Sequence, residues 1–188
     1  MRVNFRNGHY VKSAPSLKEA PKDGLPHVLF VGRSNVGKSS LINSLTGSKL
    51  AFSSKKAGKT KLLNYFLIDK AFYLVDSPGY GATSYANLST IQFSKMMEEY
   101  VKDPSLKAVV LLCDLRRDPG EEDRSFYAYL VSSGVKLLSV VTKVDKLNQK
   151  ERHEAGQRAL SLGLKDPLFS DLSPRSLDSI RKAICESL

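Results

Sequence analysis

Short apolar runs alternate along the chain with longer stretches whose apolar residues recur at helical spacing. The runs at His27–Val31, Leu62–Ile68 and Ala71–Val75 predict strands, and Asp69-Lys70 predicts a tight hairpin between the last two. Further strands are predicted at 107–113, 135–141 and 167–170, and helices at 38–45, 88–102, 121–132, 149–162 and 174–187. Such alternation is typical of a parallel sheet covered on both faces. We therefore expect a three-layer α/β domain whose mostly parallel six-stranded sheet contains one antiparallel hairpin strand.

The segments between these elements predict how the rest of the chain is organised. Residues 1–26 contain Pro15, Pro21, Gly24 and Pro26 and are expected to form an extended lead-in. Residues 48–60 and 76–87 are polar and without periodicity, so both are expected to be loops. The 188 residues are predicted to form a single domain, 1–188. In sheets of this kind, ligands bind beyond the carboxyl ends of the strands.

Composition excludes several classes of protein. The chain is 41% hydrophobic and 26% charged, as ordinary globular domains are. Its longest strongly apolar run, Ala108–Cys113, is too short to span a membrane. The N-terminus is not followed by the apolar core of a secretory signal peptide. Because the first residues are basic and contain no acid, the alternative is that they are the remnant of an organellar targeting peptide. Two distant cysteines, Cys113 and Cys185, and isolated histidines give neither a disulfide framework nor a metal site. These features indicate a cytoplasmic protein without a membrane partner.

The net charge of +10 is unevenly distributed along the chain. Residues 1–70 hold 13 Lys and Arg residues against 3 Asp and Glu residues, whereas residues 71–188 hold 16 of each. The stretch 48–61 contains no acid and five lysines: Lys49, Lys55, Lys56, Lys59 and Lys61. This excess favours a polyanionic partner, although such a run is also typical of a solvated loop.

The first chemical motif follows the strand that ends at Val31. It matches the P-loop pattern G-x-x-x-x-G-K-[ST], whose glycines let backbone N–H groups approach phosphate oxygens at the start of a helix. The alternative is a chance glycine-rich turn, but the predicted strand before and helix after the motif favour phosphate binding. Lys38 is expected to reach the β- and γ-phosphates, and the Ser39 hydroxyl to bind Mg²⁺. The predicted nucleotide-binding residues are Gly32, Arg33, Ser34, Asn35, Val36, Gly37, Lys38, Ser39 and Ser40.

A second motif, Asp76-Ser77-Pro78-Gly79, begins where the strand Ala71–Val75 ends. After an apolar strand, Asp76 is the carboxylate expected to hold Mg²⁺ through water. Gly79 is expected to offer an unobstructed N–H to the γ-phosphate. Alone, D-x-P-G is often only a turn, but its place after a P-loop and a strand favours a nucleotide-binding role for all four residues.

A third motif, Thr142-Lys143-Val144-Asp145, ends the strand 135–141 and predicts which base is bound. The Asp145 carboxylate can accept from both N1–H and N2–H₂ of guanine, whereas adenine would leave it unpaired, a mismatch that such sites reject strongly. The stem of Lys143 is expected to lie along the base plane. A lone T-K-x-D would be a solvated turn, but three motifs in this order favour GTP.

Thr60 is the candidate for nucleotide-dependent switching. Its hydroxyl would complete the Mg²⁺ shell only when a γ-phosphate is present, so that GTP orders the preceding loop and hydrolysis releases it. A threonine at a strand start is common, so this assignment rests on motif order. The predicted metal ligands are Ser39, Thr60 and Asp76. The predicted nucleotide-binding residues of this stretch are Gly58, Lys59, Thr60, Lys61 and Leu62.

Together these motifs resemble those of TRAFAC-class GTPases, and in detail those of the EngB (YihA/YsxC) family. The resemblance is carried by residues 32–43, 58–66, 76–81 and 142–147, and it runs from about Pro26 to the C-terminus. It implies a Ras-like P-loop GTPase domain that uses GTP hydrolysis as a conformational switch. It also implies a role in assembly of the large ribosomal subunit, contact with that subunit or its precursor rRNA, and an association with cell division and septation. A monomer is expected.

The chain departs from the family pattern at two places. Before Thr60 it reads Lys56-Ala57-Gly58-Lys59, where the family usually has Thr-Pro-Gly-Arg, and loss of the proline removes a fixed φ. The fifth motif, which supports the base, would be Phe169-Ser170-Asp171, with Asp171 in place of the usual small residue. A backbone contact from this loop would survive the change, so all three residues are candidates for nucleotide binding.

Tyr80 occupies the position at which many GTPases have a water-orienting glutamine, so intrinsic hydrolysis is expected to be slow. The catalytic candidates are Lys38, Thr60, Gly79 and Asn35. By resemblance to related GTPases, Asn35 would help to hold a K⁺ ion that replaces an arginine finger. The alternative is that Asn35 only shapes the P-loop.

Other interpretations remain open. The segment Asp114-Leu115-Arg116-Arg117-Asp118 also follows a strand end, where a salt-bridge cluster is favoured over a contact with nucleotide or partner. A P-loop ATPase or small-molecule kinase is opposed by the residues at 142–145. A basic RNA-binding module with a purely structural P-loop would have no nucleotide affinity.

Overall fold

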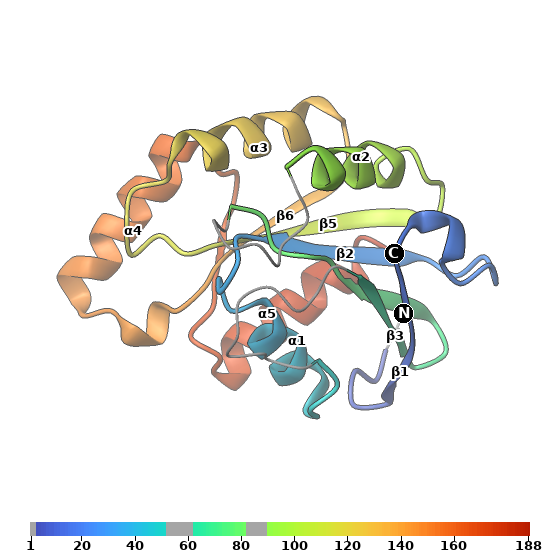
Figure 1. Ribbon diagram of the computed structural model, residues 1–188. Helices are drawn as coiled ribbons and strands as arrows, with labels where there is room; N and C mark the ends of the chain where they lie inside the picture. Colours follow the sequence, from blue (N-terminus) through green and yellow to red (C-terminus); the bar gives the residue numbers. More distant parts are fainter. Residues whose placement is uncertain (1–2, 52–61, 82–89) are drawn as a thin grey trace.

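In the computed structural model, which describes residues 3–51, 62–81 and 90–188, helices cover both faces of a central sheet (Figure 1). The strands of the described residues are β1 (Gly8–Ala14), β2 (His27–Gly32), β3 (Leu63–Ile68), β4 (Phe72–Asp76), β5 (Leu106–Cys113), β6 (Leu137–Val141) and β7 (Leu168–Phe169). The helices are α1 (Lys38–Thr46), α2 (Thr90–Tyr100), α3 (Glu121–Ser132), α4 (Gln149–Leu162) and α5 (Pro174–Cys185). Two short 3₁₀ turns are η1 (Leu17–Glu19) and η2 (Val144–Lys146).

The strands lie in the order β1-β3-β4-β2-β5-β6-β7 across the sheet. β2 pairs in parallel with β4 and β5, β6 pairs in parallel with β5 and β7, and β3 is antiparallel to both of its neighbours. Within the described ranges, β3 is thus the strand that runs against the others, which confirms the predicted hairpin. Its turn residues, Asp69 and Lys70, have φ of 50° and 53°, the left-handed backbone that matches the twist of paired strands.

The prediction of six strands is wrong, because β1 adds a seventh at the edge of the sheet. Residues that were expected to form an extended lead-in pair with β3, from Gly8 opposite Ile68 to Ala14 opposite Leu63. Side chains 9–11 of β1 are all exposed, so the segment has no period of two by which the sequence could reveal it. The pairing covers the open backbone edge of β3, and its register shifts between Tyr10 and Lys12.

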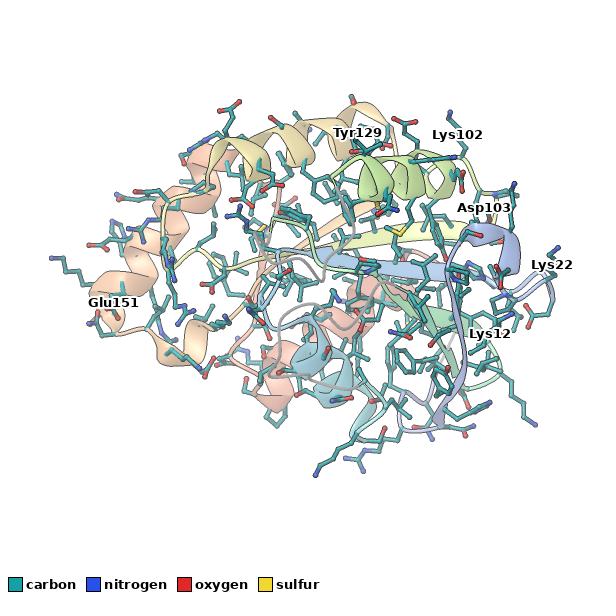
Figure 2. The ribbon with its side chains drawn as sticks, viewed as in Figure 1. Lys12, Lys22, Lys102, Asp103, Tyr129 and Glu151 are labelled. Atoms are coloured by element: carbon teal, nitrogen blue, oxygen red, sulfur yellow. The ribbon has the colours of Figure 1, made fainter. Side chains whose placement is uncertain are left out.

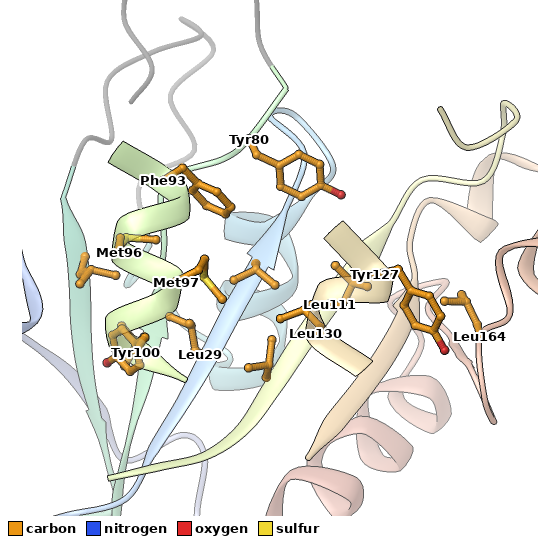
Figure 3. Close-up of a cluster of buried hydrophobic side chains, with 14 of the residues drawn as sticks. Leu29, Tyr80, Phe93, Met96, Met97, Tyr100, Leu111, Tyr127, Leu130 and Leu164 are labelled. Atoms are coloured by element: carbon orange, nitrogen blue, oxygen red, sulfur yellow. The ribbon is translucent and has the colours of Figure 1, made fainter. Parts of the chain in front are cut away.

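Two apolar layers hold the helices against the sheet. The layer beneath α2, α3 and α4 contains aromatic and sulfur-bearing side chains, and Figure 3 labels Leu29, Tyr80, Phe93, Met96, Met97, Tyr100, Leu111, Tyr127, Leu130 and Leu164. The layer beneath α1 and α5 includes Leu41, Ile42, Leu45, Leu177, Ile180 and Ile184. β2 and β4 are buried on both faces, which explains why their sequences are nearly continuous apolar runs.

Helix ends follow local sequence signals. α4 begins at a reciprocal capping box, in which Asn148 accepts from the Glu151 N–H at 3.0 Å and Glu151 accepts from the Asn148 N–H at 2.8 Å. α5 begins after Ser173, whose hydroxyl accepts from the Ser176 N–H, with Pro174 in the first turn. α3 and α4 have the predicted bounds, whereas α2 and α5 each end two residues before the predicted end; residues 88–89, where α2 was predicted to begin, lie outside the described part of the chain. None of the helices in the described part of the chain is long and apolar enough to cross a membrane.

Candidate nucleotide site

The P-loop connects the carboxyl end of β2 to the first turn of α1. A Cβ at Gly32 would lie 2.8 Å from Val36 Cγ1 and 3.1 Å from the Leu112 carbonyl oxygen, and Gly37 has φ of +104°, so glycine is required at both positions. Asn35 also has a positive φ, 64°, which asparagine adopts more readily than most residues. Left-handed residues of this kind occur in the backbone nests that bind anions.

The structure brings the P-loop lysine and the aspartate of the second motif together. Lys38 Nζ donates to Asp76 Oδ1, and the two side chains are 11% and 6% exposed, so each nearly buried charge is compensated by the other. Ser77 ties this corner to β2, since its N–H and its hydroxyl both donate to the Phe30 carbonyl oxygen, at 3.2 and 2.7 Å. Asp76 and Ser39, which follows Lys38 in α1, carry the hard oxygen donors that Mg²⁺ prefers, so these residues fit that ion.

The D-x-P-G segment continues from β4 alongside the P-loop. The Tyr80 N–H donates to the Gly32 carbonyl oxygen at 3.2 Å, and the Ser34 N–H donates to the Tyr80 carbonyl oxygen at 3.0 Å. Just before this pairing, a Cβ at Gly79 would lie 2.9 Å from both the Cα and the nitrogen of Ser34. Only glycine allows so close an approach of the two backbones.

The side chain of Tyr80 contacts aromatic rings of both α2 and α3, and Figure 3 shows it beside Phe93 of α2. It is 8% exposed, its ring centroid lies 5.8 Å from that of Phe93 and 4.8 Å from that of Phe126, and its hydroxyl donates to Asp123 Oδ1 at 3.0 Å. Burial, followed by the negative charge of Asp123, raises the pKa of Tyr80 far above its usual range. Tyr80 is therefore a neutral core residue, and its side chain does not take the place of a water-orienting glutamine.

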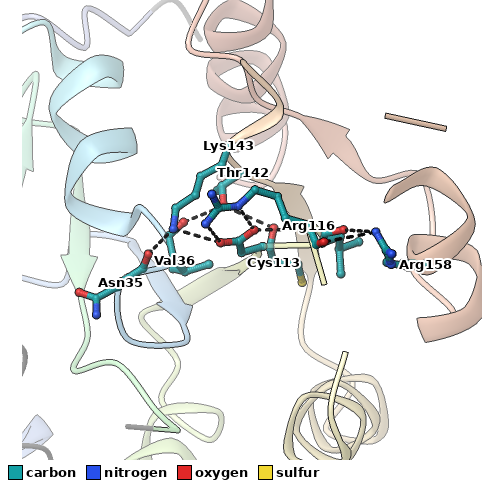
Figure 4. A network of polar contacts seen from close by, with 9 residues as sticks. Asn35, Val36, Cys113, Arg116, Thr142, Lys143 and Arg158 are labelled. Carbon is teal, nitrogen blue, oxygen red and sulfur yellow. Dashed lines mark hydrogen bonds and ion pairs between the residues drawn. The ribbon is translucent and has the colours of Figure 1, made fainter. Parts of the chain in front are cut away.

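The third motif, which follows β6, is hydrogen-bonded to the P-loop (Figure 4). Thr142 is 4% exposed and its hydroxyl donates to the Val36 carbonyl oxygen at 2.7 Å. Lys143 has φ of 61° and donates from Nζ to the Asn35 carbonyl oxygen at 2.6 Å. Asp145 follows in η2 as an exposed residue. Thr142 and Lys143 are thus in contact with the P-loop, while Asp145 faces solvent.

The predicted fifth motif lies beside the third. The Ser170 N–H donates to the Val141 carbonyl oxygen at 2.8 Å, and the Val144 N–H donates to the Ser170 carbonyl oxygen at 3.3 Å. The Ser170 hydroxyl is buried and has no hydrogen-bond partner within residues 3–51, 62–81 and 90–188. Hydrogen bonds from the side chain and backbone of Ser173 hold the pKa of Asp171 at about 2. Asp171 therefore forms its hydrogen bonds within its own loop, whereas Ser170 forms the backbone hydrogen bond to the third motif.

Several predicted site residues lie outside the described part of the chain: Gly58, Lys59, Thr60 and Lys61, together with Lys55 and Lys56 of the lysine-rich stretch. Their roles stay predictions. Leu62, directly before β3, and Phe169, at the end of β7, are 38% and 41% exposed.

The charged segment after β5 forms ion pairs, which confirms the favoured interpretation of 114–118 as a salt-bridge cluster. Asp114 pairs with Arg116 at 2.8 Å and Asp118 pairs with Arg158 at 2.8 Å. Asp114 also lies 3.0 Å from Lys143 of the third motif, a contact that the sequence did not predict. This loop, together with the P-loop and Tyr80, lines a cleft of about 420 Å³.

Sequence reasoning also missed the acidic first turn of α3. Glu122 accepts from Arg33 Nη2 at 2.8 Å, and Asp123 lies 3.5 Å from Arg33 Nε. The guanidinium of Arg33, which was predicted to be a nucleotide-binding residue, is therefore paired with α3. The three consecutive acids at 121–123 were visible in the sequence, but nothing in it indicated which cation they face.

Comparisons with known proteins agree with this geometry. The sequence profile of a family described as 50S ribosome-binding GTPase matches residues 27–143. A probable GTP-binding protein EngB of Streptococcus pneumoniae (strain Hungary19A-6) is 38% identical over 195 residues, which cover 100% of both chains. The chain belongs to the EngB family of GTP-binding proteins.

Solved structures show the fold of this EngB-family chain in other proteins. The crystal structure of a probable GTP-binding protein engB is 23% identical with a TM-score of 0.63, over 86% of this chain and 97% of that one. Era in complex with MgGDPNP and nucleotides 1506–1542 of 16S ribosomal RNA is 22% identical with a TM-score of 0.58, over 87% of this chain and 57% of that one. This EngB-family protein is therefore a GTPase with a Ras-like α/β fold.

Proposed function

We propose that this EngB-family GTPase binds GTP through the three motifs that meet at the carboxyl edge of its sheet. The observation that supports this most strongly is the direct contact between Lys38 and Asp76, because it joins the phosphate-binding and metal-binding motifs at one point. In this proposal, the N–H groups of residues 32–40 hold the phosphates and Asp145 accepts from N1–H and N2–H₂ of guanine. Lys143 lies along the base plane, and Ser170 supports the base from its other side.

Mg²⁺ would be held by Ser39, by Asp76 through water, and by Thr60 when a γ-phosphate is present. When bound, the ion would withdraw charge from the β- and γ-phosphate oxygens. Because Lys38 and Asp76 contact each other directly, we infer that Lys38 exchanges the carboxylate for phosphate oxygens when nucleotide binds. That exchange frees Asp76 for its role at the metal. The Gly79 N–H donates to the γ-phosphate in this arrangement.

Hydrolysis in this proposal is slow and serves as a conformational switch. Support comes from Tyr80, whose side chain is buried against α2 and α3 and offers no amide to an attacking water. Lys38, Thr60 and Gly79 would stabilise charge on the γ-phosphate. A K⁺ ion held in part by Asn35 would supply the positive charge that an arginine finger supplies in other GTPases.

For the partner, we propose the large ribosomal subunit or its precursor rRNA, met by a monomer in the cytoplasm, with a link to cell division and septation. The description of the matching family, 50S ribosome-binding GTPase, supports this, as does the solved complex of Era with 16S ribosomal RNA. The chain also has its whole charge excess in residues 1–70. Figure 2 shows Lys12 and Lys22 of that region extending outward on the side of the molecule away from Glu151 of α4.

Two measurements test this function. The purified protein should bind GTP roughly 10³-fold more tightly than ATP, since adenine would leave the carboxylate that pairs with N1–H and N2–H₂ of guanine without a partner. It should also sediment with purified large subunits to a greater extent with a non-hydrolysable GTP analogue than with GDP. Equal affinities for GTP and ATP would overturn the assignment of Asp145. Absence of affinity for either nucleotide would instead favour an RNA-binding module with a structural P-loop.

A further inference from the structure

Asp114, the first residue after β5, forms ion pairs with two cationic side chains at once, those of Arg116 and Lys143. Figure 4 labels both cationic residues. Arg116 donates from Nε to Oδ1 at 2.9 Å and from Nη2 to Oδ2 at 2.8 Å, and Lys143 Nζ lies 3.0 Å from Oδ2. Burial alone would raise the pKa of Asp114, but the bonds from Arg116 and Lys143 outweigh it and hold the pKa at about 2. The carboxylate is therefore charged throughout the physiological range of pH.

Lys143 connects this carboxylate to the P-loop. Its ammonium group donates to the Asn35 carbonyl oxygen at 2.6 Å, and the side chains of Lys143 and Asp114 are only 22% and 24% exposed. A long lysine side chain loses much rotamer entropy when it is fixed in one geometry, and a single neutral acceptor offsets little of that loss. A charged acceptor forms a stronger hydrogen bond. Asp114 is thus the contact that favours one conformation of Lys143.

The loop that carries Asp114 is itself held from α4. Arg158 donates from Nη1 to the carbonyl oxygens of Leu115 and Arg116, at 3.2 and 3.4 Å, and from Nε to Asp118 at 2.8 Å. Leu115 is 2% exposed, so the loop is also anchored in the core. Asp114 therefore approaches Lys143 from a backbone that is fixed on both sides.

We propose that Asp114 is a positioning residue for nucleotide binding, because it holds Lys143 against the Asn35 carbonyl and so fixes the base motif relative to the P-loop before nucleotide arrives. The proposal rests on the proposed function, in which Lys143 lies along the guanine base. When side chains of a binding site already have their bound conformation, binding requires a smaller loss of conformational entropy. Because most changes in affinity among variants of one site appear in the dissociation rate, loss of Asp114 should appear as faster release of nucleotide.

Release of a fluorescent N-methylanthraniloyl GDP from the full chain, chased with excess GDP in the presence of Mg²⁺, measures this effect. Asp114→Ala should raise the dissociation rate by about 10-fold, the value of one charge-assisted hydrogen bond at a partly exposed site. Asp114→Asn keeps an acceptor oxygen and should recover part of the loss. Asp178→Ala is the matched control, because it removes a 2.7 Å ion pair with Arg181 on α5 and should leave the rate unchanged.

A double-mutant cycle separates positioning from a general loss of stability. In a Lys143→Ala background, where Asp114 has no lysine to hold, Asp114→Ala should no longer accelerate release. Equal acceleration by Asp114→Ala with and without Lys143 would overturn the proposal, as would a release rate in Asp114→Ala and Asp114→Asn that equals that of the unmodified chain. If Asp114→Ala does not fold, the same cycle with Asp114→Asn decides by the same criterion.

These outcomes are distinct from failure of the proposed function. A chain that binds neither GDP nor GTP would remove the proposed function. Normal guanine binding with a rate that is insensitive to Asp114 would remove the positioning role alone.

Discussion

The hydroxyl of Tyr80 donates a hydrogen bond of 3.0 Å to Asp123, which binds the residue after the D-x-P-G motif to the first turn of α3. The other oxygen of Asp123 accepts from the Gly120 N–H at 3.0 Å and so caps the start of that helix. Arg33 of the P-loop lies 3.5 Å from the same carboxylate. A single acid therefore joins the P-loop, the end of the D-x-P-G segment and α3.

Tyr80→Phe removes the hydrogen bond to Asp123 and keeps the aromatic ring of residue 80. We expect the free energy of unfolding to fall by about 1 kcal/mol, since one partner of a largely buried hydrogen bond is lost. The rate of single-turnover GTP hydrolysis should stay unchanged, because the hydroxyl faces α3. Urea denaturation followed by circular dichroism and a single-turnover assay measure the two quantities.

Tyr129→Phe provides the matched control for that substitution. The hydroxyl of Tyr129 is buried and has no hydrogen-bond partner among the residues described, so its removal should leave stability unchanged or slightly higher. If Tyr80→Phe slowed hydrolysis by about 10-fold or more while Tyr129→Phe did not, the Tyr80 hydroxyl would have a part in the chemistry.

The pH dependence of stability should report on His27. This residue is 2% exposed, its Nδ1 lies 3.0 Å from the Tyr100 hydroxyl, and burial lowers its pKa against the opposing charges of Asp103 and Asp23. As pH falls, the unfolded chain therefore takes up a proton at this histidine before the folded chain does. The stability that neutral His27 contributes above its ordinary pKa of 6.5 is lost between that value and its lowered folded value.

We expect the free energy of unfolding to fall as the pH drops below about 6.5, with a slope of at most ~1.4 kcal/mol per pH unit from this one proton. His27→Phe, which keeps an aromatic ring beside Tyr65 and Tyr73, should flatten that slope. His153→Gln, at an exposed position of α4, should not. A slope that is the same in all three proteins would show that His27 does not carry the dependence.

The fold was predictable where side-chain periodicity is strong, and the bounds of α3 and α4 came directly from it. β1 could not be predicted, because its membership in the sheet is decided by the open edge of β3 and the three consecutive side chains 9–11 are exposed without alternation. An edge strand held by backbone pairing leaves almost no trace in the order of apolar and polar residues.

The site shows the same division. The sequence predicted that Lys38 and Asp76 belong to one nucleotide site, because both motifs follow strand ends, and the structure adds that the two side chains contact each other directly. The contact between Asp114 and Lys143 depends on β5 lying between β2, which leads into the P-loop, and β6, which leads into the third motif. A charged loop after a strand is common, and only the three-dimensional structure shows which of its members reaches a functional residue.

Asp145→Asn tests the base reader. We expect weaker binding of GTP and tighter binding of xanthosine triphosphate, because an amide can donate to the additional carbonyl of xanthine where a carboxylate cannot. Competition of both nucleotides against a fluorescent GDP measures the change. Asp166→Asn, at an exposed position in the loop before β7, is a control that should alter neither affinity. An unchanged affinity for GTP in Asp145→Asn would show that another residue selects the base.

Cation dependence tests the proposed role of Asn35. If its side chain helps to hold K⁺, GTP turnover should be faster in KCl than in NaCl at equal ionic strength, and Asn35→Ala should remove the difference. The positive φ of 64° at this position makes Asn35→Gly a useful companion, because glycine keeps the backbone conformation while it removes the side chain. Equal rates in the two salts would eliminate the K⁺ proposal and leave the Mg²⁺ ligands untouched.

The lysines of residues 48–61 test where the polyanionic partner is contacted. Lys55, Lys56 and Lys59 lie outside the described part of the chain, so their contact with rRNA stays a prediction from the sequence. Screening of the nucleotide phosphates does not require them, since Lys38, Mg²⁺ and the P-loop amides already serve that purpose. Their place directly before Thr60 is the one at which a γ-phosphate could control an RNA contact.

Replacing Lys55, Lys56 and Lys59 together with alanine should weaken association with the large subunit and leave GTP affinity nearly unchanged. Each phosphate contact releases counterions, so the log–log dependence of affinity on salt should become shallower by about two to three units. Lys146, Lys150 and Lys165, which are exposed in the second half of the chain, form a matched triple whose replacement should have a smaller effect. Association that is equally tight with GDP and with a GTP analogue, or the same salt slope in both triple variants, would show that this lysine-rich stretch is not the nucleotide-controlled RNA contact.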